Sequence, residues 1–417
     1  MPSIKHIIIS ILVLLALANS SCLKSKKPGI PPEVIQTLNN SGIQKPNLLK
    51  VILAFQKQED SLKLQSAYYL IQNLESNYSL KITLKDSNNL DVVININDFS
   101  DYQSIKKYID SLEITSGKLI YKTDSILLDI NNVSSVFLIS HINNSVNIFQ
   151  NTTWGSDYDI NTYYNNILPY RIANEKIEPY TSHLHNKYKY ITDKEHDITK
   201  IALHINNLIN NELSYDNRLE ITPNIQSIKT IEKSKSGNWR DINIYKVKAL
   251  RSIGIAAALD YTPYFSDSIL GYYSTTVILP DKKILKLPNS DNNQIQYQQG
   301  KTAKVYRRSF KYDSTSLFTI KDKKIHTPPF LGNFNYIDVT NEYLQTESIS
   351  INITDTSKYV YLAVYNENSW KPIEWAIVQP NGKVNFYNMG TEIIYMPVVV
   401  SEDSIISIGE PFLLNAK

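Results

Sequence analysis

Cysteine is almost absent from this sequence: Cys22 is the only one among 417 residues. A single cysteine cannot form a disulfide within the chain or supply a multi-thiolate metal site. If Cys22 is itself modified, no free thiol remains for nucleophilic catalysis either. The cysteine count therefore excludes most thiol chemistry before any motif is considered.

Glycine and net charge are also low. The chain has 12 glycines, and no segment matches the GxxxxGK[ST] loop that cradles nucleotide phosphates. Its 43 basic and 40 acidic residues are scattered, which leaves a formal net charge of +3. No basic patch of the kind that binds nucleic acid stands out. We therefore expect no nucleotide, no nucleic-acid partner and no cofactor.

One apolar run dominates the N-terminus. The run 7–18 follows Lys5 and ends shortly before Cys22, which is preceded by two serines. The run is too short for a membrane-spanning helix and is typical of an export signal. Small residues before Cys22 favour a lipoprotein signal, with an ordinary secretory signal as the alternative. We expect acylated Cys22 to anchor the protein at the bacterial outer membrane, on its periplasmic face or the cell surface.

Hydrophobic periodicity predicts an α+β fold in which helices precede strands. Two packed helices are expected after Pro46, and an amphipathic helix is expected after Asp197. Beyond Phe265 the pattern changes to short alternating strands. The expected organisation is a signal peptide at 1–22, a polar tether at 23–45, a mainly helical region at 46–150, a core domain at 151–300, connecting strands at 301–337 and a β-sandwich at 338–417.

The segment "GNWRDINIYKVKALRSIGIAAALDYTPYF" begins at Gly237 and carries the most informative pattern. It predicts a helix from Trp239 to Ser252, a stop at Gly254 and then a buried strand. That strand is expected to pair with a following strand that contains Tyr272.

These residues carry a family resemblance. "SGNWRD" followed by "VKALRSIGIAAALDYTPYF" resembles the core motif of transglutaminase-like proteins, in which a G-x-C-x-D turn opens a helix that ends in A-L-R-x-x-G-I-P-A. "LPYRIANEKIEPY" and "TPPFLGNFNYIDVTNEY" resemble flanking segments of transglutaminase-like lipoproteins of the Bacteroidetes. The resemblance covers most of the mature chain and implies a papain-like core between a helical region and a β-sandwich.

The catalytic positions depart from the family pattern. Trp239 occupies the position of the nucleophilic cysteine, and Tyr272 occupies that of the histidine. The position of the orienting acid falls near Asn289, in a window without a carboxylate. Because an indole has no nucleophilic or titratable atom, no acyl-enzyme can form on Trp239. The resemblance therefore implies a degenerate triad and an inactive enzyme.

Other retained residues have structural explanations. Asp241 and Arg251 are expected to complement the two ends of the helix dipole, and Gly254 is expected to supply a positive φ. Trp239 either fills the former cleft or, together with Tyr272, lines a groove that holds a peptide or glycan.

The alternative is a hydrolase or acyltransferase with a different nucleophile. Ser236 and Ser274 are the candidates, and folding would have to bring His183 or His185 near one of them. The two histidines lie in a segment expected to be a loop, and no metal is expected there. His141 and His204 are expected to be structural. The preferred function is a lipid-anchored binding or scaffold protein for a peptide or glycan.

Overall fold

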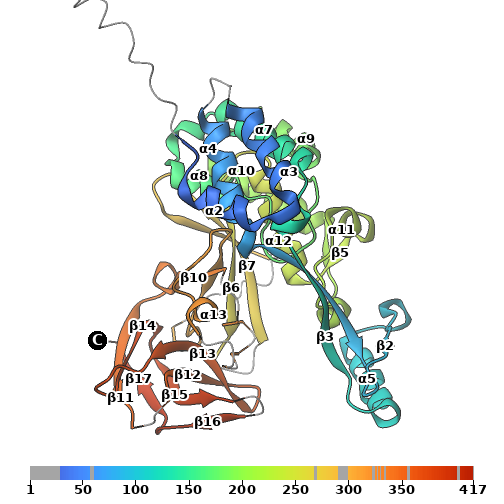
Figure 1. The fold of residues 1–417 in the computed structure, drawn as a ribbon. Helices are drawn as coiled ribbons and strands as arrows, with labels where there is room; N and C mark the ends of the chain where they lie inside the picture. Colours follow the sequence, from blue (N-terminus) through green and yellow to red (C-terminus); the bar gives the residue numbers. More distant parts are fainter. Residues whose placement is uncertain are drawn as a thin grey trace, which may run out of the picture.

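The computed structural model describes residues 29–56, 61–266, 270–289, 299–321, 325, 327–328, 330–332, 335–354, 357–401 and 404–416. The expected signal peptide, Cys22 and the start of the tether lie outside these residues. The described chain has a mixed α+β fold with a helical upper part, a central sheet and a C-terminal β-rich region (Figure 1). Within this part of the chain, no helix is both long and apolar enough to cross a membrane.

The first helices form one side of the helical layer. They are α2 (Pro32–Asn40), α3 (Lys45–Gln56) and α4 (Ser61–Gln72). The two packed helices expected after Pro46 correspond to α3 and α4, which bury Ile52 and Leu70 in a common core. Helix α2 lies inside the segment that was expected to be a tether. Its proline, Pro32, does not prevent a helix, because it stands in the first turn, where proline is tolerated.

A β-sheet interrupts the region expected to be mainly helical. It contains β1 (Tyr78–Lys85), β2 (Asp91–Val92) and β3 (Ile120–Leu128) in the antiparallel order β2-β1-β3, with α5 (Tyr102–Ser116) between β2 and β3. In Figure 1 this arm projects away from the helices and from the C-terminal region. Strand β3 is exposed along nearly its whole length, so the arm has no layered core of its own.

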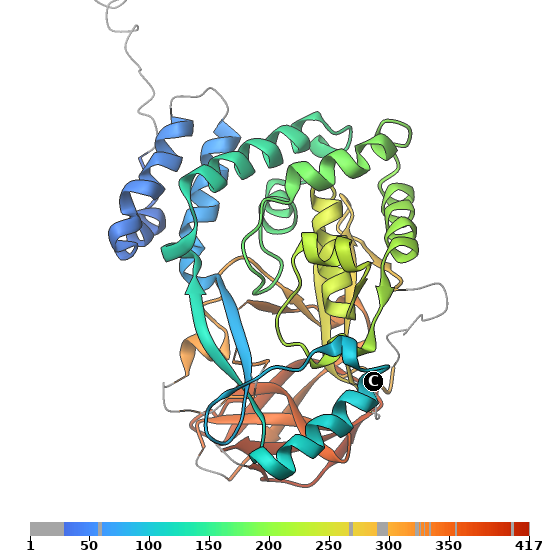
Figure 2. The same cartoon turned by 90° about the vertical axis from the view of Figure 1, so that its right-hand side faces the viewer.

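The remaining helices cover the central sheet from above (Figure 2). They are α6 (Asp129–Asn132), α7 (Ser135–Asn151), α8 (Ile160–Asn166), α9 (Thr181–Thr192), α10 (Ile198–Glu212) and α11 (Ile228–Ser234). Asp197 caps α10 as expected, because its side chain accepts from the Thr199 and Lys200 backbone N–H groups. The segment with His183 and His185 is helical in α9, and the expectation of a loop was wrong.

The central sheet has the strand order β10-β9-β6-β7-β8. Its strands are β6 (Ala257–Tyr264), β7 (Leu270–Ile278), β8 (Ile284–Leu287), β9 (Tyr306–Arg308) and β10 (Tyr336–Asp338). Helix α12 (Trp239–Arg251) runs into β6, and β6 pairs antiparallel with β7 through Tyr261 and Tyr273, as the sequence predicts. Strands β9 and β10, which were expected to be connecting strands, extend this sheet beyond β6.

The C-terminal region contains two sheets around one core. One sheet pairs β11 (Thr346–Asn352) with β14 (Lys383–Gly390). The other has the order β13-β12-β15-β16, and β17 also pairs with β15. Its strands are β12 (Tyr359–Asn366), β13 (Ser369–Ile377), β15 (Ile393–Val400), β16 (Ile405–Ser407) and β17 (Phe412–Leu414). Val360 and Phe386 come from different sheets and share one buried cluster. The short helix α13 (Leu317–Ile320) lies between the two halves of the molecule.

Candidate functional site

Helix α12 begins directly after a closely packed pair of short parallel strands. Strand β4 (Ser214–Tyr215) pairs parallel with β5 (Ser236–Gly237), which places Tyr215 opposite Gly237. A Cβ atom on Gly237 would lie 3.0 Å from Ile231 Cδ1, so there is little room for a side chain at position 237. Asn238 then caps the helix, and its side chain accepts from the Asp241 backbone N–H at 3.0 Å.

Trp239 is the first residue of α12 and is only partly buried. Its indole stacks on the Tyr215 ring with the centroids 4.6 Å apart and an angle of 7° between the planes. Tyr215 is itself 41% exposed. Trp239 therefore packs against the core and also forms half of an aromatic pair at the protein surface.

Glu220 lies beside this aromatic pair. Burial raises the pKa of its carboxyl, while the nearby Tyr215 hydroxyl and the charge of Arg240 oppose the increase. Burial also raises the pKa of the Tyr215 hydroxyl, and the charge of Glu220 adds to that increase. Glu220 thus places a carboxyl near the N-terminus of α12, where the helix dipole favours negative charge.

The sheet presents Tyr273, and not Tyr272, toward α12. The Thr275 hydroxyl donates to Asn243 Oδ1 of α12 at 2.9 Å, so the odd-numbered side chains of β7 face the helix. Tyr273 shares that face, whereas Tyr272 points to the opposite face and is 6% exposed. The sequence analysis placed Tyr272 beside Trp239, but Tyr273 is the tyrosine of β7 that faces α12. Strand alternation is the reason, because a shift of one residue changes the face.

Asn243 connects the positions that the resemblance assigns to a triad. Its Nδ2 donates to the Trp239 carbonyl at 2.7 Å and to Asn289 Oδ1 at 2.9 Å. Asn289 in turn donates to the Tyr273 carbonyl at 3.1 Å. Amide groups therefore occupy the place where an acid–base pair would be needed, and an amide neither attacks nor titrates in the accessible pH range. Sequence reasoning missed Asn243, although a polar residue four positions after Trp239 was a usable signal.

The structural residues have different partners from those expected. Asp241 is buried and accepts from the Gln226 side chain at 3.1 Å, and burial raises its pKa. The first-turn N–H group is satisfied by Asn238 instead. Arg251 donates to the carbonyls of Ala257 and Pro169 and not to the end of its own helix.

Burial lowers the pKa of Arg251 to about 10. Its guanidinium therefore joins the helix to the strand that follows and to the segment before α9. Gly254 has φ +79°, in agreement with its expected role as a helix stop.

The histidines have other partners than the candidate serines. His183 pairs with Glu232 at 2.9 Å, and His185 Nδ1 contacts the Ser252 carbonyl at 3.0 Å. Ser274 is an even-numbered residue of β7, so its side chain points away from α12. Ser236 lies on β5.

Two further histidines, His141 and His204, lie on α7 and α10. His141 is buried between the Leu168 carbonyl and the Thr181 hydroxyl, whereas His204 is exposed. Among the described residues, no group of three or more His, Cys, Asp or Glu side chains could hold a metal ion.

Aromatic rings continue from Tyr273 along the same face of the sheet. Tyr261 stacks on Tyr273 at 4.4 Å, and Tyr336 lies 6.3 Å from Tyr261. Arg308 lies over the Tyr336 ring at 4.7 Å.

Arg308 is 9% exposed, and its Nε has no hydrogen-bond partner in the described structure. A buried guanidinium without a carboxylate is costly, so its retention needs an explanation. We define the α12 surface as Tyr215, Trp239, Tyr261, Tyr273 and Arg308.

Comparison with known proteins adds little. No protein-family model and no curated protein matches the chain. One solved structure is similar, a crystal structure of a "putative protease" from Parabacteroides distasonis, with a TM-score of 0.24 and 10% identity. The match covers 81% of this chain and 65% of that one, and so less than two thirds of the other protein. At this TM-score the similarity establishes neither a shared fold nor a shared activity, and the transglutaminase-like resemblance stays a prediction.

Proposed function

We propose that this protein is a catalytically inactive, transglutaminase-like lipoprotein that binds a peptide or glycan at the α12 surface. One observation carries the proposal: an indole stands at the helix start where the resemblance requires a thiol. Trp239 has no atom that attacks a carbonyl, and the neighbouring Tyr273, Asn243 and Asn289 cannot serve as general bases near neutral pH.

The geometry of Trp239 supports binding in place of simple cavity filling. A pure filler would be fully enclosed, but Trp239 is partly buried and stacks on the exposed Tyr215. Aromatic rings with polar edges are the side chains that most often anchor ligands at protein surfaces. Arg308 adds a guanidinium whose Nε has no hydrogen-bond partner in the described structure, which suits a carboxylate on the bound chain.

The alternative enzyme is less well supported. Ser274 points away from α12, and His183 and His185 bond to Glu232 and to the Ser252 carbonyl. A serine nucleophile needs a base within hydrogen-bond reach. His183 and His185 do not supply that base, because their partners are Glu232 and the Ser252 carbonyl.

A turnover assay separates the two functions. The mature protein, incubated with panels of peptides, amides, esters and oligosaccharides, is expected to bind members of one panel and to convert none. Trp239→Ala is expected to lose that binding while remaining folded, with a lower melting temperature because Trp239 also packs on the core, and Trp370→Ala on the distant β13 serves as the control. Turnover by the unmodified protein that a single Ser, Asp or His substitution abolishes would establish an enzyme instead.

A further inference from the structure

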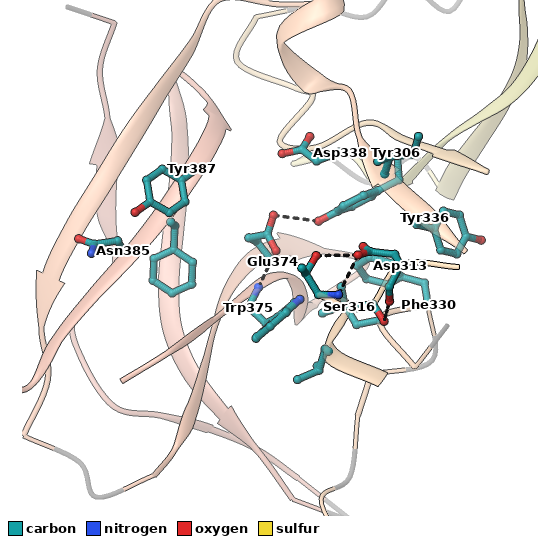
Figure 3. Close-up of a pocket in the computed structure, with 15 residues that line it drawn as sticks. Tyr306, Asp313, Ser316, Phe330, Tyr336, Asp338, Glu374, Trp375, Asn385 and Tyr387 are labelled. Carbon is teal, nitrogen blue, oxygen red and sulfur yellow. Dashed lines mark hydrogen bonds between the residues drawn. The ribbon is translucent and has the colours of Figure 1, made fainter. Parts of the chain in front are cut away.

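A cavity lies between the central sheet and the C-terminal β-rich region. It has a volume of about 410 Å³, within the range of small-molecule sites. Strands β9 and β10 form one wall, and β13 and β14 form the other. Figure 3 shows Asn385 and Tyr387 on one side of the cavity and Tyr336 and Asp313 on the other. Contacts between two structural units are a common location for ligand sites.

Aromatic side chains dominate the lining. The rings that line the cavity are those of Tyr306, Phe330, Tyr336, Trp375, Phe386 and Tyr387. Tyr387 is 63% exposed and Trp375 is partly buried, so their rings are accessible from solvent. Flat rings with polar edges suit a ligand that has apolar faces and a polar rim.

Three of these aromatic residues have a polar group that is available to a ligand. The Tyr336 hydroxyl, the Tyr387 hydroxyl and the Trp375 indole N–H make no hydrogen bond in the described part of the chain. The Tyr306 hydroxyl, by contrast, is already used, because it donates to the Ile373 carbonyl at 2.7 Å. A ligand in the cavity thus meets several donors and acceptors that folding has not consumed.

Three carboxylates line the cavity, those of Asp313, Asp338 and Glu374, and the latter two share one cation. The fully buried Lys304 ammonium lies 2.7 Å from Asp338 Oδ2 and 2.6 Å from Glu374 Oε2. Asp338 Oδ1 also accepts from the Thr340 hydroxyl at 2.6 Å, and Glu374 Oε1 accepts from the Trp375 backbone N–H at 2.9 Å. A cationic ligand would have to compete with Lys304 for these oxygens. Aromatic faces, free hydroxyls and carboxylates that accept hydrogen bonds together favour a ligand rich in hydroxyl groups.

We propose that this cavity is a binding site for a neutral saccharide unit, with Trp375 as the stacking platform and the Tyr336 and Tyr387 hydroxyls as hydrogen-bonding groups. The proposal goes beyond the α12 surface and does not depend on it. Tyr336 contacts both regions, because its ring also lies near Tyr261. A glycan longer than one unit would therefore extend from the cavity toward Trp239.

Titration calorimetry with defined probes tests the site. The mature protein is titrated with cellobiose, maltose and N,N′-diacetylchitobiose, and separately with trilysine and choline. At least one disaccharide is expected to bind, with an affinity that stays unchanged between low and high salt because the ligand is uncharged. Binding only of trilysine or choline, weakened by salt, would overturn the proposal, as would binding of none of the probes.

Variants locate the binding. Trp375→Ala is expected to weaken disaccharide binding at least tenfold, and Tyr336→Phe is expected to weaken it several-fold because only a hydroxyl is removed. Trp370→Ala, on the same strand but outside the cavity, is the matched control and should bind as the parent does.

If Trp375→Ala fails to fold, Tyr387→Ala replaces it, because the exposed Tyr387 contributes little to packing. Unchanged affinity in the folded cavity variants would overturn the assignment. Loss of binding in Trp239→Ala alone would place the disaccharide at the α12 surface and so reject the cavity.

Discussion

Tyr215 and Trp239 lie face to face at the start of α12, with ring centroids 4.6 Å apart and an interplanar angle of 7°. The parallel pairing of Tyr215 with Gly237 sets this geometry, because Gly237 precedes Trp239 by two residues. The position that the sequence resemblance assigns to a nucleophile therefore holds one half of a surface aromatic pair.

The register of β7 predicts which substitution restores thiol chemistry. In a Cys22→Ser background, Trp239→Cys combined with Tyr273→His should react with iodoacetamide near pH 6.5 about tenfold faster than Trp239→Cys alone. The reason is that an imidazolium on the helix-facing side lowers the thiol pKa. The matched control is Trp239→Cys with Tyr272→His, which should behave like the single variant. Activation by Tyr272→His in place of Tyr273→His would contradict the assigned register.

Arg308 should lower the stability of the fold while it contributes to ligand binding. Arg308→Met keeps the long side chain over Tyr336 but removes an unpaired, buried charge, so the free energy of unfolding should rise by about 1 kcal/mol or more. Binding of carboxylate-bearing ligands at the α12 surface should weaken about tenfold in the same variant. Urea unfolding and calorimetry measure the two effects. A less stable Arg308→Met with unchanged binding would show that the guanidinium has a purely structural role.

Lys246 should make stability depend on pH. Its side chain is fully buried, its Nζ donates to the Pro288 carbonyl at 3.1 Å, and burial lowers its pKa to about 7 from the ordinary value of 10.5. Between these two values the unfolded chain binds more protons than the native one, so the free energy of unfolding should rise with pH from about 7 to 10.5.

The slope contributed by Lys246 is at most about 1.4 kcal/mol per pH unit. Urea unfolding at several pH values measures it. Lys246→Met should be the more stable protein near pH 7 and should lose this part of the slope. An equal slope in both proteins would mean that Lys246 is charged in the native state.

The proposed membrane anchor depends on Cys22. Expressed in a bacterial host with a lipoprotein pathway, the parent protein should fractionate with membranes, and Cys22→Ser should be soluble because it lacks the acylated residue. Fractionation followed by mass spectrometry of the N-terminal peptide measures this. Membrane association of a folded Cys22→Ser variant would reject lipid anchoring.

Local sequence signals predicted much of the central fold. The helix after Trp239, the Asp197 cap and the β6–β7 pairing follow from periodicity and capping, which act over a few residues. Helix α9 was missed because polar residues mask its apolar spacing, although Leu184 and Tyr188 lie one turn apart and are buried. The arm was missed because β3 is exposed on both faces and therefore lacks an alternating pattern.

The site depended on contacts that no local pattern shows. The face of β7 became known only through the bond between Thr275 and Asn243. The stack of Tyr215 on Trp239 joins residues that are 24 positions apart in the sequence. The unpaired state of Arg308 is likewise a property of the folded chain, because a sequence does not show which charges find partners.

The central claim is that the chain binds a ligand at Trp239 without converting it, and one comparison tests this most directly. Parent, Trp239→Ala and Trp370→Ala proteins are applied to the same peptide and glycan arrays, and the bound ligands are recovered and weighed by mass spectrometry. The account predicts that the parent and Trp370→Ala bind a common ligand, that Trp239→Ala loses it while remaining folded, and that the recovered ligand is unchanged in mass. Equal binding by the folded Trp239→Ala protein, or a recovered ligand that has been cleaved or acylated, would contradict it.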